Sequence, residues 1–158
     1  MPKKPLETKY SISPIFQKRI KEAIEEHELT KVQFAKAVGV SKDVIIKITT
    51  YQIVPSIKSI IKIADYLQLP ILYLFGETEY DYFTPAREPS TFLVRIEQLT
   101  EEKGIKYSAL SHKLSFAPNA VYEWFRTNSI PSLDYLIELA NYFDVSVDYL
   151  LGRTDDRK

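Results

Sequence analysis

The chain of 158 residues is 45% hydrophobic and 27% charged, which is typical of a globular protein with one domain or two small ones. It has no cysteine and no long apolar stretch, so disulfides, thiolate metal sites and membrane-spanning helices are excluded, and we expect a soluble, cytoplasmic protein. The formal net charge is zero, but residues 1–87 carry 13 Lys and Arg against 10 Asp and Glu, whereas residues 88–158 carry 8 against 11. The average therefore conceals a basic first half and an acidic second half, although nucleic-acid-binding proteins are usually basic overall.

The first predicted helix begins after Ser13, a capping residue, with Pro14 at its first position. It ends near His27. Thr30 and Gln33 then form a capping-box pattern that opens a second helix, "TKVQFAKAV". Apolar residues recur every three or four positions in these stretches, which favours helices over strands.

A tight turn is predicted between the second helix and a third, "SKDVIIKIT". Gly39 ends the second helix, Ser41 caps the third, and only Gly39 and Val40 separate them. After an irregular "YQIVP", Ser56 caps a fourth helix, and a short fifth helix at residues 70–75 is closed by Gly76.

The segment "ETEYDYFTPAREPST" has two prolines and no helical period, which predicts a linker at residues 79–90. Its Tyr80, Tyr82 and Phe83 leave two alternatives open. Either the segment packs against one or both domains, or it is a solvated linker with incidental aromatic residues.

A duplication becomes visible when the sequence is shifted by 76 positions, because 14 of 63 aligned residues are then identical. The second copy repeats the plan, with helices expected at residues 106–114, 117–126, 132–143 and 146–151, and with Pro118 in the first turn of its third helix. Two copies are too few for a solenoid. We therefore expect an all-α chain with two tandem five-helix domains, at residues 12–78 and 91–154.

These features resemble the Cro/C1-type helix-turn-helix repressors of bacteria and phages, the XRE family, over about four fifths of the chain. The resemblance is carried by "LTKVQFAKAVGVS" in copy one and by "ELANYFDVS" and "SVDYLLG" in copy two. It implies two lambda-repressor-like domains and a sequence-specific, repressor-like transcriptional regulator that binds double-stranded DNA. We also expect no enzymatic activity, catalytic residue, cofactor, metal or small-molecule substrate, because His27 and His112 are not at metal-ligand spacing and the chain has no Gly-rich phosphate loop. One departure is Ser115, which replaces the turn glycine, Gly39, and is expected to change the helix angle or weaken DNA contacts.

The resemblance also assigns DNA-contacting residues, because the third helix of such domains enters the major groove. In copy one these are Ser41, Lys42, Asp43 and Lys47, and in copy two Ala117, Pro118, Asn119 and Glu123, with Tyr122 beside them. Phosphate contacts are expected from Lys31, Gln52, Tyr107, Arg126 and Asn128. Ile46 either meets a thymine methyl group or lies in a protein interface.

Charge over the reading units supports DNA binding by both copies. Residues 30–55 have four lysines against Asp43, and residues 106–131 have three basic residues against Glu123. Glu123 nevertheless has the wrong sign for a phosphate-rich surface. The alternative function is therefore a protein-interaction or dimerisation module, in which domain 2 has lost DNA binding and contacts another regulator or a second copy. Trp124 is expected in the core, and His27 and His112 are expected to be surface histidines.

Overall fold

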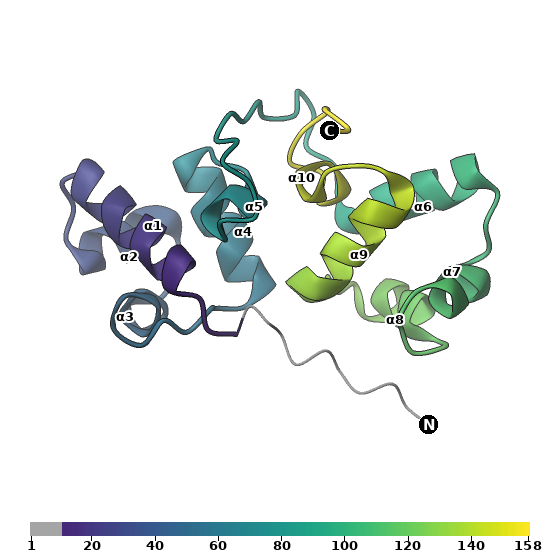
Figure 1. Cartoon of the computed structure of the whole chain (residues 1–158), viewed down its shortest axis with the longest axis horizontal. Helices are drawn as coiled ribbons and strands as arrows, with labels where there is room; N and C mark the ends of the chain where they lie inside the picture. The colour runs from purple at the N-terminus through teal and green to yellow at the C-terminus, as the bar shows by residue number, and fades with distance from the viewer. Residues whose placement is uncertain (1–10) are drawn as a thin grey trace. The chain divides into compact units, whose positions relative to one another are not determined.

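The computed structural model describes residues 11–158, and its regular structure there is helical (Figure 1). Residues 11–83 form one compact unit and residues 84–158 form the other. The N-terminal unit contains α1 (Pro14–Glu26), α2 (Lys31–Val38), α3 (Lys42–Tyr51), α4 (Ile57–Leu67) and α5 (Ile71–Leu74). The C-terminal unit contains α6 (Phe92–Lys103), α7 (Tyr107–Lys113), α8 (Ala120–Thr127), α9 (Leu133–Phe143) and α10 (Val147–Leu150). The predicted all-α fold of two five-helix domains is confirmed.

Side-chain caps begin the helices of the N-terminal unit where the sequence predicts them. The Ser13 hydroxyl accepts a hydrogen bond from the Phe16 amide at 3.1 Å, with Pro14 at the first helical position. Thr30 and Gln33 form a complete capping box, since each side chain accepts from the other residue's amide. These caps satisfy amide groups that a helix start otherwise leaves without an acceptor.

The core of the N-terminal unit is formed by the apolar faces of all five helices. Fully buried residues include Phe16, Ile20, Phe34, Ile45, Ile48, Ile63, Ile71 and Leu74. The rings of Phe16 and Phe75 stack with centroids 4.7 Å apart, which joins the first helix to the end of the fifth. Such burial of large apolar side chains is the main favourable term in folding a domain of this size.

The segment before α1 is paired with the loop after α3, which the sequence does not predict. Ile12 and Ile53 form an isolated antiparallel bridge, and the Ser13 amide donates to the Gln52 carbonyl at 3.0 Å. This short pairing fixes the position of the chain where it leaves α3.

The core of the C-terminal unit uses the positions that align with the core of the N-terminal unit, and aromatic residues around Trp124 enlarge it. Trp124 is buried, and its ring makes edge contacts with Phe92 at 5.6 Å and Phe116 at 5.2 Å. The expectation that Trp124 is a core residue is confirmed.

The predicted linker divides into two parts with different environments. Tyr80 and Tyr82 are exposed and contact each other, with ring centroids 6.0 Å apart. Residues 84–90, in contrast, are held by the residues after α10, since the amides of Ala86 and Ser90 donate to the carbonyls of Arg153 and Gly152. The second half of the segment therefore packs on the C-terminal unit. The exact domain limits of residues 12–78 and 91–154 stay a prediction.

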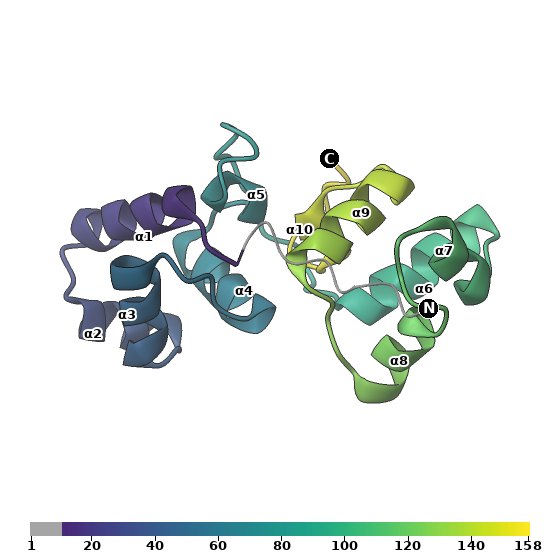
Figure 2. The same cartoon turned by 60° about the horizontal axis from the view of Figure 1, so that its bottom comes forward.

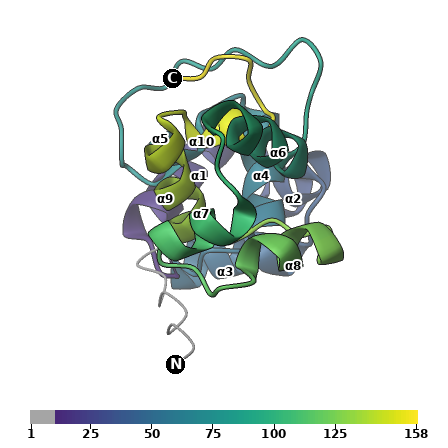
Figure 3. The ribbon, with the colours of Figure 1, turned by 90° about the vertical axis from the view of Figure 1, so that its right-hand side faces the viewer.

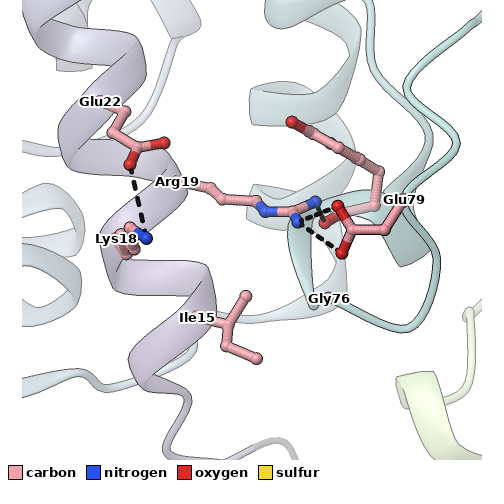
Figure 4. Close-up of a pocket in the computed structure, with 7 residues that line it drawn as sticks. Ile15, Lys18, Arg19, Glu22, Gly76 and Glu79 are labelled. Atoms are coloured by element: carbon pink, nitrogen blue, oxygen red, sulfur yellow. Dashed lines mark hydrogen bonds and ion pairs between the residues drawn. The ribbon is translucent and has the colours of Figure 1, made fainter.

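An arginine on the first helix of each domain contacts a tyrosine ring of the fifth helix and a carboxylate that follows that helix. The Arg19 guanidinium lies 3.7 Å from the Tyr73 ring centroid and pairs with Glu79 at 3.4 Å. Arg95 lies 3.9 Å from the Tyr149 ring centroid and pairs with Asp155 at 3.8 Å. A cavity of about 280 Å³ opens beside Arg19, between α1 and the segment around Gly76 (Figure 4).

Candidate nucleic-acid interface

The turn between α2 and α3 is tight because Gly39 adopts a left-handed conformation there. Its φ is +90°, its amide donates to the Ala35 carbonyl at 2.9 Å, and Ser41 caps α3 by accepting from the Val44 amide. On α4, the Lys62 ammonium donates to the Gly39 carbonyl at 3.3 Å. Helices α2 and α3 therefore lie in contact, with α4 bracing their turn (Figure 2).

The first two turns of α3 present most of the predicted base-contacting residues to solvent. Ser41, Lys42, Asp43 and Lys47 are exposed, while Ile46 is half-buried. Within residues 11–158, the side chains of Lys42 and Lys47 make no hydrogen bond and no ion pair. Both ammonium groups are therefore available to an external acceptor.

The start of α2 offers a second polar surface beside α3. Lys31 is exposed at the first helical position. The Thr30 side chain and carbonyl accept from the Gln33 and Phe34 amides, which leaves the first two amides of the helix without a helical acceptor. Such free amides and the helix dipole favour an anion at this end.

Gln52 has a different environment from the other predicted phosphate contacts. It is half-buried at the end of α3 with φ +60°, and its side-chain amide donates to the Gln17 side chain at 3.1 Å. Gln17 in turn donates to the Thr49 carbonyl at 2.7 Å. Gln52 therefore ties the end of α3 to α1 in this structure.

In the C-terminal unit, α8 begins at Ala120 and ends at Thr127, so its predicted start at residue 117 is wrong. Ala117, Pro118 and Asn119 are exposed but lie in the turn before the helix, and Pro118 is outside the first helical turn. The physical reason is the missing cap, because Ala117 stands where Ser41 caps α3 and has no side-chain acceptor. Asn119 is the N-cap residue but makes no side-chain capping bond.

The turn before α8 also differs from its counterpart in backbone conformation. Leu114, the C-cap residue of α7, has an extended conformation, and Ser115 is not among the residues with positive φ. The Glu138 carboxylate on α9 accepts from the Ser115 amide at 2.7 Å and from its hydroxyl. Glu138 thus braces this turn from the position that Lys62 occupies in the first domain.

Aromatic side chains connect α7 to α8, which lie side by side (Figure 3). The Tyr107 ring stacks on Phe125 at 5.0 Å and makes an edge contact with Tyr122 at 5.7 Å. Burial raises the pKa of the Tyr107 hydroxyl, and the Glu97 carboxylate raises it further. Tyr107 is half-buried at this aromatic contact, whereas Tyr122 is 52% exposed.

Arg126 and Glu123 neutralise each other on the exposed side of α8. The Arg126 Nε atom lies 3.1 Å from both Glu123 carboxylate oxygens, and its Nη2 atom lies 2.6 Å from one of them. These hydrogen bonds hold the pKa of Glu123 below its usual value and raise the pKa of Arg126. Asn128, also exposed, ends the helix with φ +50°.

The two presumed reading surfaces differ further in charge when the bracing helices α4 and α9 are included. The bracing helix α4 carries Lys58 and Lys62, of which Lys62 contacts the turn, while the aligned positions of α9 carry Asp134 and Glu138. Because Arg126 is already paired with Glu123, we expect the C-terminal surface to attract phosphates weakly.

The structure also bears on metal and membrane sites. Within residues 11–158, no group of three or more His, Asp or Glu side chains is arranged to hold a metal ion. His27 contacts the Ala23 carbonyl through Nδ1 at 2.8 Å, and His112 is exposed. None of the helices in this part of the chain has the length and apolar character needed to cross a bilayer.

Comparison with known proteins agrees with this geometry. A curated relative, the uncharacterized HTH-type transcriptional regulator YobD of Bacillus subtilis (strain 168), is 37% identical over 62 residues, which are 39% of this chain and 55% of that protein. The chain thus spans about half the length of this relative. No solved structure matches the chain. The profile of the family described as helix-turn-helix matches residues 20–74 and 96–150, one stretch in each unit. Since these stretches cover more than half of the sequence, the chain belongs to the XRE-type helix-turn-helix family.

Proposed function

We propose that this protein is a sequence-specific transcriptional regulator that binds double-stranded DNA, acts as a repressor, and reads its operator mainly with α3. The observation that carries the proposal is the first two turns of α3, where Ser41, Lys42 and Lys47 are exposed and the two lysines are unpaired within residues 11–158. The family membership and the transcriptional regulator among its relatives support the same function.

The chemistry of α3 fits the edges of base pairs in the major groove. Lysine side chains donate to guanine O6 and N7, and the Asp43 carboxylate could accept from cytosine N4. Lys31 and the first amides of α2 would bind a backbone phosphate on the same side, because helix starts favour anions. Phosphate contacts fix the position of α3, and base contacts supply specificity.

The C-terminal domain is proposed to contribute less to DNA binding. Its aligned helix α8 offers a neutralised Glu123–Arg126 pair and the exposed Tyr122 in place of free cations. These observations favour the second candidate function for this domain, namely contact with another protein. Asn119 and Asn128 remain exposed and could still reach DNA in a weaker contact.

Binding of a labelled DNA duplex, measured by fluorescence anisotropy across a salt series, tests the proposal. Replacing Lys42 and Lys47 together by alanine removes the two cations that the proposal places at base edges in the groove, so affinity should fall at every salt concentration, while the slope of log affinity against log salt should become shallower by at most about 2. The matched variant, Asn119→Ala with Arg126→Ala, should change affinity and slope much less.

Two results of this experiment would count against the proposal. If the affinity of the wild-type chain for the duplex does not depend on salt, the proposal that the chain binds DNA is wrong. Equal losses in both double variants would mean that the two domains read DNA equally.

A further inference from the structure

In the C-terminal domain, the residues that follow α10 hold the non-helical segment that leads into α6. The Ser90 amide donates to the Gly152 carbonyl at 3.2 Å. The Asp155 carboxylate accepts from the Arg87 amide at 3.1 Å. Residues 152–155, called here the C-terminal strip, therefore bind this segment through its peptide groups.

The N-terminal domain presents the same acceptors after its fifth helix. Residues 76–79 align with the C-terminal strip and are called here the N-terminal strip. Within the part of the chain that the structure describes, the Gly76 carbonyl accepts no hydrogen bond. The Glu79 side chain is 88% exposed, and its carboxylate pairs with an arginine of the first helix, Arg19, as that of Asp155 does. Both acceptors that the C-terminal strip uses are thus present again.

The chain before α1 takes a different path from the segment before α6. Pro14 aligns with Ser90, and a proline has no amide hydrogen to donate to the strip. Directly before it, the Ser13 amide donates to the Gln52 carbonyl at 3.0 Å, in the loop after α3. The described residues before α1 therefore do not cover the N-terminal strip.

The cavity beside Arg19 adjoins the N-terminal strip (Figure 4). It is bordered by Gly76 and Glu79 of the strip and by Ile15 and Arg19 of α1, and its volume is about 280 Å³. The Arg19 guanidinium packs on the Tyr73 ring, so it is held in place. The site thus offers fixed polar groups and an apolar side chain to a segment that lies along the strip.

We propose that the N-terminal strip binds a non-helical, proline-containing segment of another protein, whose amides donate to the Gly76 carbonyl and the Glu79 carboxylate. The chemistry of this occupant follows from residues 84–90, "TPAREPS", which have two prolines and no net charge and occupy the aligned strip. Prolines restrict the unbound segment, so less conformational entropy is lost when it binds. Helices α3 and α5 lie apart within the N-terminal unit (Figure 1, Figure 2), so the bound partner leaves the DNA-reading helix accessible.

An NMR titration of the isotope-labelled full chain with the end-blocked peptide TPAREPS tests the proposal. In the chain itself, a short tether supplies an effective concentration in the millimolar range, so the segment stays on its strip with only millimolar affinity. We therefore expect saturating shifts of the amides of residues 76–79, with a Kd of about 1 mM. Residues 152–155 should shift much less, because their strip is already filled. No DNA is present, so the outcome does not depend on the proposed function.

Two changes that remove the same hydrogen bond make the test specific. Glu79→Ala should weaken peptide binding about fivefold or more, because it removes a charged acceptor of a peptide amide. The matched control is Asp81→Ala, which removes an exposed carboxylate two residues later and should leave the Kd unchanged. Methylation of the peptide nitrogen at the Arg87 position removes the donor of that bond. It should weaken binding to the wild-type chain and have little further effect on Glu79→Ala.

Several outcomes would overturn the proposal. One is the lack of saturable shifts at residues 76–79 up to about 5 mM peptide, and another is equal affinity of the wild-type chain and Glu79→Ala. Deletion of residues 2–10 should leave the affinity unchanged, and a gain of about tenfold or more would assign the strip to the chain's own N-terminal segment instead. Shifts at residues 76–79 that grow with protein concentration in the absence of peptide would assign the strip to a second copy.

Discussion

At the residue scale, the two domains use equivalent positions with opposite charges. Lys62 donates to the Gly39 carbonyl, while the aligned Glu138 accepts from the Ser115 amide and hydroxyl. Each side chain braces the turn before the third helix of its domain, so the structural task is the same. The sign, however, decides whether the brace adds to a DNA-binding surface or subtracts from it.

Gly76 and Gly152 occupy aligned positions, and Gly152 leaves less room for a side chain than Gly76 does. Gly152 has φ +76°, and a Cβ atom built on it would lie 2.2 Å from the Ser90 carbonyl oxygen. We expect Gly152→Ala to lower the free energy of unfolding of the C-terminal domain by about 3 kcal/mol or more, from backbone strain and the clash together. Urea denaturation followed by circular dichroism measures this loss.

Gly104 provides the matched control for that substitution. Its φ is +64°, but no atom lies within 4 Å of a Cβ atom built there. Gly104→Ala should therefore cost only about 1 kcal/mol, the strain of a left-handed conformation. Equal losses at the two positions would show that residues 84–90 are not held against Gly152.

At the scale of single helices, the cap decides where the reading helix begins. Ser41 caps α3 through its hydroxyl, and the helix begins at the next residue, so that Lys42 and Asp43 lie in its first turn. In the second domain Ala117 offers no acceptor, and α8 begins three residues later. Pro118 and Asn119, which align with Lys42 and Asp43, are consequently in the turn before the helix.

Substitutions at Ser41 separate the cap from the DNA contact. Ser41→Ala should lower the free energy of unfolding by about 1 kcal/mol and weaken DNA binding, because the first turn of α3 frays. Ser41→Asn should preserve stability, since an asparagine side chain also accepts from the helix amides. Thermal unfolding and anisotropy on the same samples measure both effects, and a stable, fully active Ser41→Ala chain would contradict the role of this cap.

At the scale of the whole molecule, the division into two units predicts that a substitution can destabilise one domain without destabilising the other. Ile20 and Ile96 are aligned, fully buried core residues of the first helix in each domain. Each change to alanine should destabilise its own domain by about 3 kcal/mol, from lost burial and the cavity left behind. Calorimetry should show one lowered transition in each variant.

The same pair of variants tests the division of labour between the domains. Ile20→Ala, at a temperature where only the N-terminal domain is unfolded, should abolish DNA binding. Ile96→Ala under the corresponding condition should leave the DNA contact of the N-terminal domain in place. The reverse pattern would assign DNA reading to the C-terminal domain.

Much of the fold could be predicted from the sequence because the signals for it are local. Helix periodicity, the Thr30–Gln33 capping box and the left-handed Gly39 each act within a few residues, and the repeat fixed the number of domains. The exposure of Lys42 and Lys47 followed from their place on a helix with an apolar opposite face. The shifted start of α8 could have been foreseen from the missing cap at Ala117.

What the amino-acid sequence determined by itself was the class of fold and the family, since both depend on short patterns that recur in each copy. Only the tertiary structure decided which charges are free. The pairing of Arg126 with Glu123, the bracing of two turns by Lys62 and Glu138, and the attachment of residues 84–90 to the residues after α10 all depend on the distances between side chains in space. Electrostatic attraction falls with distance and is cancelled by a neighbour of opposite sign, so a count of charges along a sequence cannot say how strongly a surface attracts DNA.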